Sequence, residues 1–457
     1  MMHGMEIIDK YLKKYAVFPV RPLLTASVAF VEQAVVIPAL AESASLFRTL
    51  SCIAANPPCD LRRTLVVCVV NNYRPTVAAE EEIRDNQATL CILGELIAGR
   101  TPSVVGSAIL KSDIERIADS GIRLGCIDAS SAGVEIPDRD GGVGTARKIG
   151  MDGVLAVLNG RGPGGGVICC LDADTLVMEN YLAAVQTHFA TTGDPAAVAS
   201  YAHQKPADPK LLAAICCYEI FLRAYVIGLS FAGSPYAFHA IGSTMSCTAQ
   251  AYAAVRGMNR RTAAEDFHFL DKLAKLRRVG QIGTTMVFPS SRQSHRVPFG
   301  TGQRMLRFMN GETDEYRLHD SRIFAILREW LSGMEAAPDR DSEAILADAQ
   351  KIHPELKEYL ELSRFETDWP VIRRNCPDAE HLRRQFHVWF DGLKTLRLVH
   401  HLSRSAFPPL PMFEGLKGLL GRMGQSIPLL AAIPSGIPEP DIQFRILEEM
   451  RSCFPES

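Results

Sequence analysis

The sequence predicts a layered α/β domain with a mainly parallel sheet, followed by a mostly helical C-terminal region. Short, uninterrupted apolar runs recur at residues 34–40, 64–70 and 167–171, and stretches with helical spacing separate them. Uninterrupted runs of this length are typical of strands buried on both faces, and strands that alternate with helices form layered α/β domains. Past about residue 305 the apolar residues recur only at helical spacing, which predicts the helical region.

The predicted elements alternate along the chain up to about residue 304. Residues 1–30 are expected to form a short helix and an irregular arm, and the strand at 34–40 is expected to stop at Pro38. Residues 75–120 are expected to form a polar, mainly helical insertion. The other strands are expected at 64–70, 121–128, 167–171, 196–201, 240–247 and 282–288, and the helices at 42–56, 141–158, 179–190, 209–229, 248–256 and 262–276.

This order predicts three regions: an N-terminal helical arm at 1–30, the α/β domain at 31–304 and a helical C-terminal region at 305–457. A chain of 457 residues suits two or more domains. The net charge of −2 offers no basic surface for a nucleic acid. None of the twelve cysteines forms a C-x-x-C pair and most lie in apolar runs, which indicates buried, reduced thiols in a cytosolic protein.

The sequence predicts neither a signal peptide nor a transmembrane segment. The N-terminus has scattered charges, and no window reaches about 18 uncharged apolar residues. The most apolar long stretch, 211–233, carries Glu219 and Arg223 and is expected to be a buried helix. A cytoplasmic location follows. Peripheral contact with the inner face of the membrane through residues 407–430 is the alternative, but a packed helix is favoured there.

Two carboxylates, Asp172 and Asp174, follow the strand at 167–171. In open α/β sheets, ligands bind at the carboxyl ends of the strands. Carboxylates spaced i, i+2 at a strand end can converge on one hard cation, and Mg²⁺ or Mn²⁺ takes oxygen ligands and shares them with substrate phosphates. The alternative is that Asp174 or Thr175 caps the next helix while Asp172 is a solvated turn residue.

A glycine-rich turn at residues 141–144 precedes a helix that carries Arg147 and Lys148 in its first turns. Glycines before a helix expose backbone N–H groups, and a helix N-terminus attracts phosphate. The pattern is neither G-x-G-x-x-G after a clear strand nor the P-loop motif. A simple turn with a solvated basic pair is the alternative.

The pair Glu265-Asp266 lies at the start of another predicted helix. Thr262 and Glu265 have the spacing of a capping box, so Glu265 is expected to satisfy a backbone N–H. Asp266 is either a carboxylate that favours the first turn of the helix or a general base that deprotonates an acceptor hydroxyl.

The loop at residues 290–303 is polar, basic and glycine-bearing. It holds Arg292, His295 and Arg296, and Arg304 follows it. Basic groups on such a loop suit closure over a diphosphate, and His295 can supply a nitrogen ligand to the metal. The alternative is a solvated surface loop. His400 and His401 are neighbours on a helix, so they point apart and cannot chelate together.

In combination these motifs resemble the family 2 glycosyltransferases of the GT-A fold, over residues 32–304. The matching segments are VVIPALAES followed by LFRTL, VVCVVNN, GTARKIG, CLDADT, AEDFHFL and RVPFGTGQR. The sequence departs from the family at Asn71-Asn72, which replace an acidic pair, and at Lys148, which replaces an asparagine. The terminal motif lacks its tryptophan, and without transmembrane helices a processive polymer synthase is not expected.

The resemblance implies a three-layer α/β/α domain that moves a sugar from a nucleotide-diphosphate sugar to an acceptor hydroxyl, with inversion. Mg²⁺ or Mn²⁺ would be the cofactor, held by Asp172 and Asp174 with His295, and Asp266 would be the catalytic base. The residues implied for donor binding are Pro38, Ala39, Glu42, Asn71, Arg147, Lys148, Asp172 and Arg296. The acceptor is a saccharide, a lipid or a small molecule that the sequence does not name.

Other functions remain open at this stage. A retaining glycosyltransferase that acts on a small soluble acid would use His295 as a metal ligand and would not use Asp266 as a base. A catalytically silent binding or scaffold protein would present the helical region as its partner surface. A nucleotidyltransferase would need a glycine-rich loop after the first strand, where this chain has PALAES instead.

Overall fold

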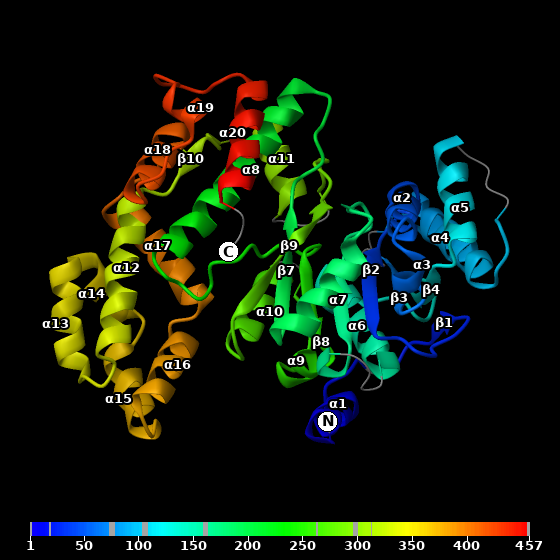
Figure 1. Ribbon diagram of the computed structural model, residues 1–457, viewed down its shortest axis with the longest axis horizontal. Helices are drawn as coiled ribbons and strands as arrows, with labels where there is room; N and C mark the ends of the chain where they lie inside the picture. The colour runs from blue at the N-terminus through cyan, green and yellow to red at the C-terminus, as the bar shows by residue number, and fades with distance from the viewer. Residues whose placement is uncertain are drawn as a thin grey trace. The chain divides into compact units, whose positions relative to one another are not determined.

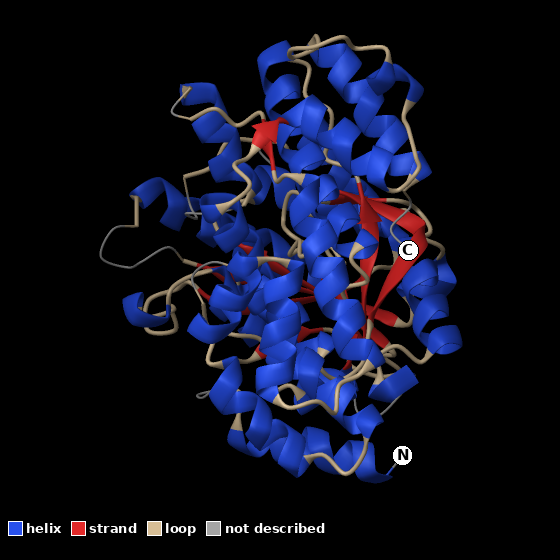
Figure 2. Cartoon of the chain, turned by 90° about the vertical axis from the view of Figure 1, so that its left-hand side faces the viewer, coloured by secondary structure: helices blue, strands red, loops and turns tan. Residues whose placement is uncertain are grey.

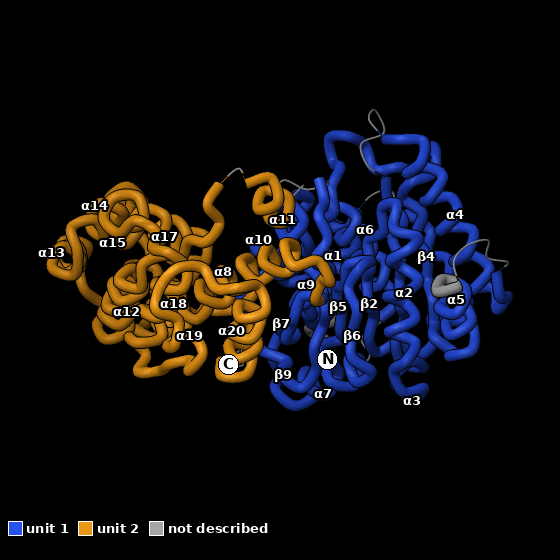
Figure 3. Tube along the Cα trace, turned by 90° about the horizontal axis from the view of Figure 1, so that it is seen from above, with its two compact units in different colours: residues 1–204, 240–303, 456–457 blue, residues 205–239, 304–455 orange. Residues whose placement is uncertain are grey.

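The computed structural model describes residues 2–17, 20–72, 78–102, 108–158, 163–261, 264–295, 300–311 and 313–454. The chain forms two compact units (Figure 3). Unit 1 comprises Met1–Gln204, Ala240–Gln303 and Glu456–Ser457, and unit 2 comprises Lys205–His239 and Arg304–Pro455. The N-terminal arm thus belongs to unit 1. The segment Lys205–His239, which the sequence prediction placed in the α/β domain, belongs to unit 2 because its long helix is part of the helical core there.

Unit 1 is built on a nine-stranded sheet with the order β1-β4-β3-β2-β5-β8-β7-β9-β6 (Figure 1). Strands β2, β3, β4, β5, β7 and β9 share one direction, and β1, β6 and β8 oppose it. The predicted α/β class with a mainly parallel sheet is therefore confirmed. The strands are β1 Leu23–Thr25, β2 Gln33–Ala39, β3 Thr64–Asn71, β4 Arg123–Ala129, β5 Val167–Cys170, β6 Leu176–Val177, β7 Ala196–Tyr201, β8 Met245–Thr248 and β9 Val279–Phe288.

Helices cover both faces of this sheet. Alternate residues of the central strands, such as Val35 and Ile37, share one buried cluster with residues of α2, α5 and α7. The residues between them face α6, which packs so closely that a Cβ on Gly150 would lie 2.7 Å from Val69. The helices of unit 1 are α1 Met2–Lys14, α2 Ser43–Ala54, α3 Pro58–Leu61, α4 Glu80–Ile97, α5 Ala108–Ser120, α6 Val143–Leu158, α7 Tyr181–Thr192, α9 Ala249–Ala254 and α10 Glu265–Ala274, with 3-10 turns at Asp138–Asp140 and Pro163–Gly165.

Two details of the predicted elements are corrected. Strand β2 does not stop at Pro38 but continues to Ala39, and Pro38 pairs with Val69. Leu171 N donates to Val36 O at 3.1 Å, so the backbone groups of Val36 point toward β5. The backbone of Pro38, two residues later, points to the same side. The β2–β5 ladder has ended by then, so the missing N–H of proline costs no ladder bond. The arm after α1 is also not wholly irregular, because it adds β1 to the edge of the sheet.

Unit 2 is helical around one large apolar core, as predicted, whereas strands gather mainly in the sheet of unit 1 (Figure 2). Within this core, Trp330 packs edge to face against Phe365 and Phe386, and all three side chains are buried. A short β10–β11 ribbon at Arg317–Leu318 and Leu410–Pro411 is an addition that the sequence did not predict. The helices are α8 Pro209–Phe231, α12 Ser321–Ala336, α13 Ser342–Ile352, α14 Pro354–Leu362, α15 Phe365–Asn375, α16 Ala379–Trp389, α17 Gly392–Ser405, α18 Met412–Arg422, α19 Pro428–Ala431 and α20 Pro440–Cys453; α11, Thr301–Asn310, crosses the boundary between the units.

Helix α8 is long and apolar enough to cross a membrane by length and composition, and 67% of its most apolar window is buried inside the protein. Two of its charged residues, Glu219 and Arg223, are also buried. Arg223 Nε donates to Glu219 Oε1 at 2.9 Å, and Arg451 of α20 donates to both oxygens of Glu219 at 2.8 Å. Glu219 therefore joins α20 to α8. The stretch at 211–233 was predicted to be a buried helix, and α8 agrees with this.

Replacing Glu219 with alanine is expected to lower the free energy of unfolding by about 3–5 kcal/mol, because Arg223 and Arg451 would lose the buried carboxylate that they share. Denaturant unfolding measures this. The matched control is Glu335→Ala, which removes a half-exposed partner of Arg383 and His387 and should cost less than about 1 kcal/mol. Equal losses in the two variants would contradict the structural role of Glu219.

Candidate active site

The site lies at the carboxyl ends of β2 and β5. From β2 the chain continues to β3 and β4 on one side, and it returns to the other side of β2 with β5. Connections that leave neighbouring parallel strands in opposite directions open a crevice, which is where open α/β sheets bind ligands. The segments that reach this crevice are Leu40–Glu42, after β2, and Leu171–Asp174, after β5.

The turn that carries Asp172 and Asp174 is held at each of its three carbonyls. Thr175 N donates to Asp172 O at 3.1 Å, and Thr49 Oγ1 of α2 donates to Ala173 O at 2.9 Å. Gln204 Nε2, beyond β7, donates to Asp174 O at 2.9 Å. The backbone of this turn is therefore fixed, and it presents two carboxylates whose side chains are 36% and 20% exposed.

Arg147 of α6 joins Asp172 to Glu265. Its guanidinium is buried, with 4% of the side chain exposed, and it hydrogen-bonds both carboxylates. Burial alone would lower the pKa of Arg147, but Asp172 and Glu265 outweigh it, and the net shift is upward. The guanidinium lies directly against Gly242, where a Cβ would be 2.7 Å from Arg147 Cζ. In this structure Arg147 therefore holds the carboxylates of Asp172 and Glu265 in place.

Asp266 stands at the N-terminus of α10, next to Glu265. Its Oδ1 accepts the backbone N–H of Phe267 at 2.7 Å. Burial, followed by the charge of Glu265, raises the pKa of Asp266 to about 7, although Arg147 opposes the shift. A carboxylate with a pKa near neutrality is suited to accept a proton from a substrate hydroxyl.

The predicted capping box does not form in the described residues. Helix α10 begins at Glu265, and its N-cap is Ala264, which has a left-handed φ of 57°. Glu265 is therefore the first residue of the helix rather than the third residue after its cap, and its side chain binds Arg147. Thr262 lies outside the described residues.

Asp174 is held on the other side of the turn by Arg292, which follows β9. Arg292 Nε lies 2.7 Å from Asp174 Oδ2, and Arg292 Nη2 hydrogen-bonds Glu42 Oε1. Burial raises the pKa of Asp174 to about 6, with contributions from Asp172 and Glu42 that Arg292 partly offsets. Glu42 itself precedes α2, and its side chain is only 7% exposed.

The insertion at residues 75–120 supplies residues that the sequence did not single out. Asn86 of α4 accepts from Ala41 N and donates to Asn71 O, both at 2.9 Å, so it ties the end of β2 to the end of β3. Ala41 has a left-handed φ of 47°, a strained conformation for alanine. Asp85, next to Asn86, binds the backbone and the hydroxyl of Ser43. Nothing in the periodicity of α4 marks these two residues, because their partners lie 15 to 45 positions away.

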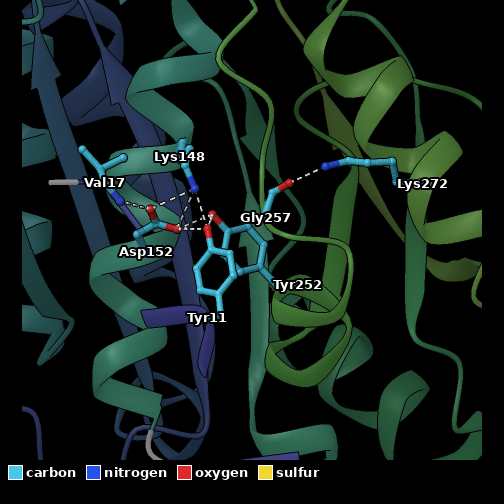
Figure 4. A network of polar contacts seen from close by, with 7 residues as sticks. All are labelled: Tyr11, Val17, Lys148, Asp152, Tyr252, Gly257 and Lys272. Carbon is cyan, nitrogen blue, oxygen red and sulfur yellow. Dashed lines mark hydrogen bonds and ion pairs between the residues drawn. The ribbon is translucent and has the colours of Figure 1, made fainter. Parts of the chain in front are cut away.

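Lys148 belongs to a different cluster from the one predicted for it (Figure 4). Its Nζ lies 3.1 Å from Asp152 Oδ2 and also donates to Tyr11 Oη. Asp152 Oδ1 accepts from Tyr11 and Tyr252 at 2.6 Å each, and Oδ2 accepts from Val17 N at 2.8 Å. Lys148 is thus occupied with fastening the N-terminal helix to α6 and α9, and the structure does not bring it to the two aspartates.

The other residues predicted for the site differ in burial, and one of them is not described. Pro38 and Ala39 are buried in β2, and Asn71 is buried at the end of β3. His295 is exposed, and Arg296 lies outside the described residues. The structure therefore gathers Asp172, Asp174, Arg147, Asp266 and Glu42 into one connected cluster, together with Glu265 and Arg292.

Asp172 and Asp174 are carboxylates of the kind that Mg²⁺ and Mn²⁺ take, but the predicted set of three ligands does not come together. Asp172, Asp174 and His295 do not bring ligand atoms within 4.8 Å of one another; among the residues searched, the set that does is Glu355, Glu358 and His401 in unit 2. Two hard carboxylates are nevertheless sufficient, because Mg²⁺ is commonly held by one or two carboxylates and by substrate phosphates. The cluster has more carboxylates than arginines. A bound cation would offset the repulsion between these carboxylates and an anionic ligand.

No protein-family model and no curated protein matches the chain. Solved structures that match include S. aureus TarS 1-349 in complex with UDP-GlcNAc, at 12% identity over 78% of this chain and 91% of that chain, with a TM-score of 0.36. Another is the mannosyltransferase PcManGT from Pyrobaculum calidifontis in complex with GDP-Man and Mn²⁺, at 14% identity over 100% of this chain and 95% of that chain, with a TM-score of 0.33.

Proposed function

We propose that unit 1 is a metal-dependent glycosyltransferase that moves a sugar from a nucleotide-diphosphate sugar to an acceptor hydroxyl, with inversion. The observation that carries the proposal is the pairing of a rigid turn, which presents Asp172 and Asp174 at the switch point of the sheet, with Asp266, which Arg147 links electrostatically to Asp172. This arrangement supplies a cation site for a diphosphate and a nearby carboxylate able to take a proton.

The proposed donor site runs from the end of β2 to the turn after β5. The nucleotide would lie across Pro38, Ala39, Glu42 and Asn71, which are buried at the ends of β2 and β3 and before α2. Asp172 and Asp174 would hold Mg²⁺ or Mn²⁺. When bound, the cation offsets the negative charge that develops on the leaving nucleoside diphosphate.

Asp266 would act as the general base. Its carboxylate would take the proton of the acceptor hydroxyl as the oxygen attacks the anomeric carbon from the face opposite the diphosphate, which inverts the configuration. The raised pKa of Asp266 fits this task, because a base works best with a pKa near the operating pH. NMR of the product anomer distinguishes inversion from retention, and retention would contradict the proposed role of Asp266.

Thermal unfolding with candidate donors tests the metal-dependent donor site. UDP-GlcNAc and GDP-Man, the ligands named for two of the matching structures, are the first to try with Mn²⁺. A bound donor at about 100 times its Kd should add about 2.7 kcal/mol of stability and raise Tm, and EDTA should abolish the gain.

Two variants make the same experiment specific. Asp174→Asn should lose the metal-dependent part of the gain. Asp348→Asn, which changes a partly exposed carboxylate of unit 2 that pairs with Arg340, should keep it. A donor-induced gain that survives EDTA would contradict the metal assignment. No gain with any nucleotide sugar would contradict the donor assignment and favour a silent binding protein.

A further inference from the structure

Arg292 stands between the two carboxylates that flank the donor site. It bridges Asp174, on the turn after β5, and Glu42, at the start of α2. The three side chains differ in exposure: Glu42 is 7% exposed, Asp174 20% and Arg292 42%. Arg292 is thus the most accessible member of the group, and Glu42 the least.

We propose that Arg292 is a positioning residue that neutralises Asp174 until a divalent cation binds, and that it then turns to the diphosphate while Glu42 retains it. The inference rests on the proposed function, because it assumes that Asp174 is the cation ligand. It assigns to Arg292 two successive partners, a carboxylate first and a phosphate second.

The geometry indicates which group moves. Asp174 is on a turn whose carbonyls are fixed by α2 and by Gln204, so its backbone stays in place. A cation that takes the carboxylate of Asp174 competes with the guanidinium for the same oxygens and repels its charge. Arg292 can leave Asp174 without losing Glu42, because different nitrogens contact the two residues.

Glu42 gives the released guanidinium a defined location. A planar guanidinium has five N–H donors, so an arginine held at one edge by Glu42 still offers the others to phosphate oxygens. Binding of the cation at Asp174 therefore makes available a second positive group beside the same diphosphate. A lysine at this position would supply charge but could not bridge two acceptors in the same fork geometry.

The pairing of Arg292 with Asp174 is tested by titrating the purified protein with Mn²⁺ alone. Calorimetry or electron paramagnetic resonance measures the Mn²⁺ affinity. Arg292→Gln removes the competing charge and is expected to bind Mn²⁺ about tenfold more tightly than wild type. Arg278→Gln makes the same change at the far end of β9, where Arg278 pairs with Asp194, and should leave Mn²⁺ affinity unchanged. Equal or weaker Mn²⁺ binding by Arg292→Gln than by wild type, or no binding by either, would overturn the proposal.

Titration with inorganic pyrophosphate at saturating Mn²⁺ tests the second partner. Here Arg292→Gln is expected to bind about tenfold more weakly than wild type, the opposite sign from the Mn²⁺ titration, and Arg292→Lys should lie between them. A purely structural role would shift both affinities in one direction, which would overturn the proposal. If Arg292→Gln does not fold, Arg292→Lys must still bind pyrophosphate more weakly than wild type, because lysine keeps the charge but cannot contact Glu42 and the phosphate in the same fork geometry. Neither titration uses a sugar donor. A negative result for Arg292 can therefore be distinguished from a failure of the proposed glycosyl transfer.

Discussion

Replacing Asp266 with asparagine is expected to lower kcat for glycosyl transfer by about 10²–10⁴-fold, because the amide cannot take the proton of the acceptor hydroxyl. Donor binding should be unchanged, since Asp172 and Asp174 remain. Asparagine keeps the size of the side chain and can still accept the N–H of Phe267. Steady-state kinetics with calorimetric measurement of donor affinity separates the two effects.

The pH dependence follows from the raised pKa of Asp266, which is about 7 instead of 3.8. In wild type, kcat/KM should rise tenfold per pH unit below about pH 7 and level off above it, because only the ionised carboxylate is a base. The folded protein binds this proton more tightly than the unfolded chain, so the group lowers stability progressively as pH rises from about 4 to about 7. At pH 8 the Asp266→Asn variant should therefore be more stable than wild type, because it has no carboxylate to ionise there.

The control for this pair of effects lies on the same helix. Asp271→Asn makes the same chemical change at a carboxylate that pairs with Lys275 at 2.8 Å, and it should leave kcat and the pH profile close to wild type. Near-normal turnover of Asp266→Asn would refute the base role. A normal pH profile with lost activity would show that Asp266 acts in some way other than proton transfer.

Replacing Arg147 with methionine is expected to remove both activity and stability. The buried carboxylate of Glu265 would lose its partner, which should cost about 3–5 kcal/mol in the free energy of unfolding. Asp172 would lose the group that orients it toward the donor site, so kcat/KM should fall even where the variant remains folded. Urea unfolding and kinetics at low temperature measure the two losses.

A double variant separates these roles of Arg147. Arg147→Met with Glu265→Gln no longer buries an unpaired charge, so much of the stability should return while activity stays low. Arg147→Lys keeps the charge but cannot bridge two carboxylates, and it should be intermediate in activity. Full activity in the stabilised double variant would contradict a positioning role for Arg147 and leave it a structural residue.

Site residues could be predicted from the sequence where their immediate neighbours in the chain mark their place in the fold. Asp172 and Asp174 directly follow an apolar strand, and Asp266 directly follows a helix start, so their places in the fold could be predicted from neighbouring residues. Arg292 and Asn86 act through partners 45 or more positions away, at Glu42, Asp174 and Ala41. Such pairings leave no periodic pattern in the sequence.

The errors have the same physical origin. Arg147 and Lys148 are adjacent and of like charge, and a sequence pattern treats them as one basic pair. On a helix, neighbours point about 100° apart, so Arg147 reaches Asp172 and Glu265 while Lys148 reaches Asp152 and Tyr11. Pro38 was expected to end its strand, but the side of β2 that it faces no longer has a neighbour to bond.

By itself, the sequence determined the layered α/β class, the helical second part and the strand end that presents two aspartates, because hydrophobic period and local turn chemistry specify these features. The tertiary structure alone decided which charges meet: Arg147 with Glu265 and Asp172, Arg292 with Glu42 and Asp174, and Lys148 with Asp152. Electrostatic partners are set by distance in space and by burial, and both depend on how the strands and helices pack.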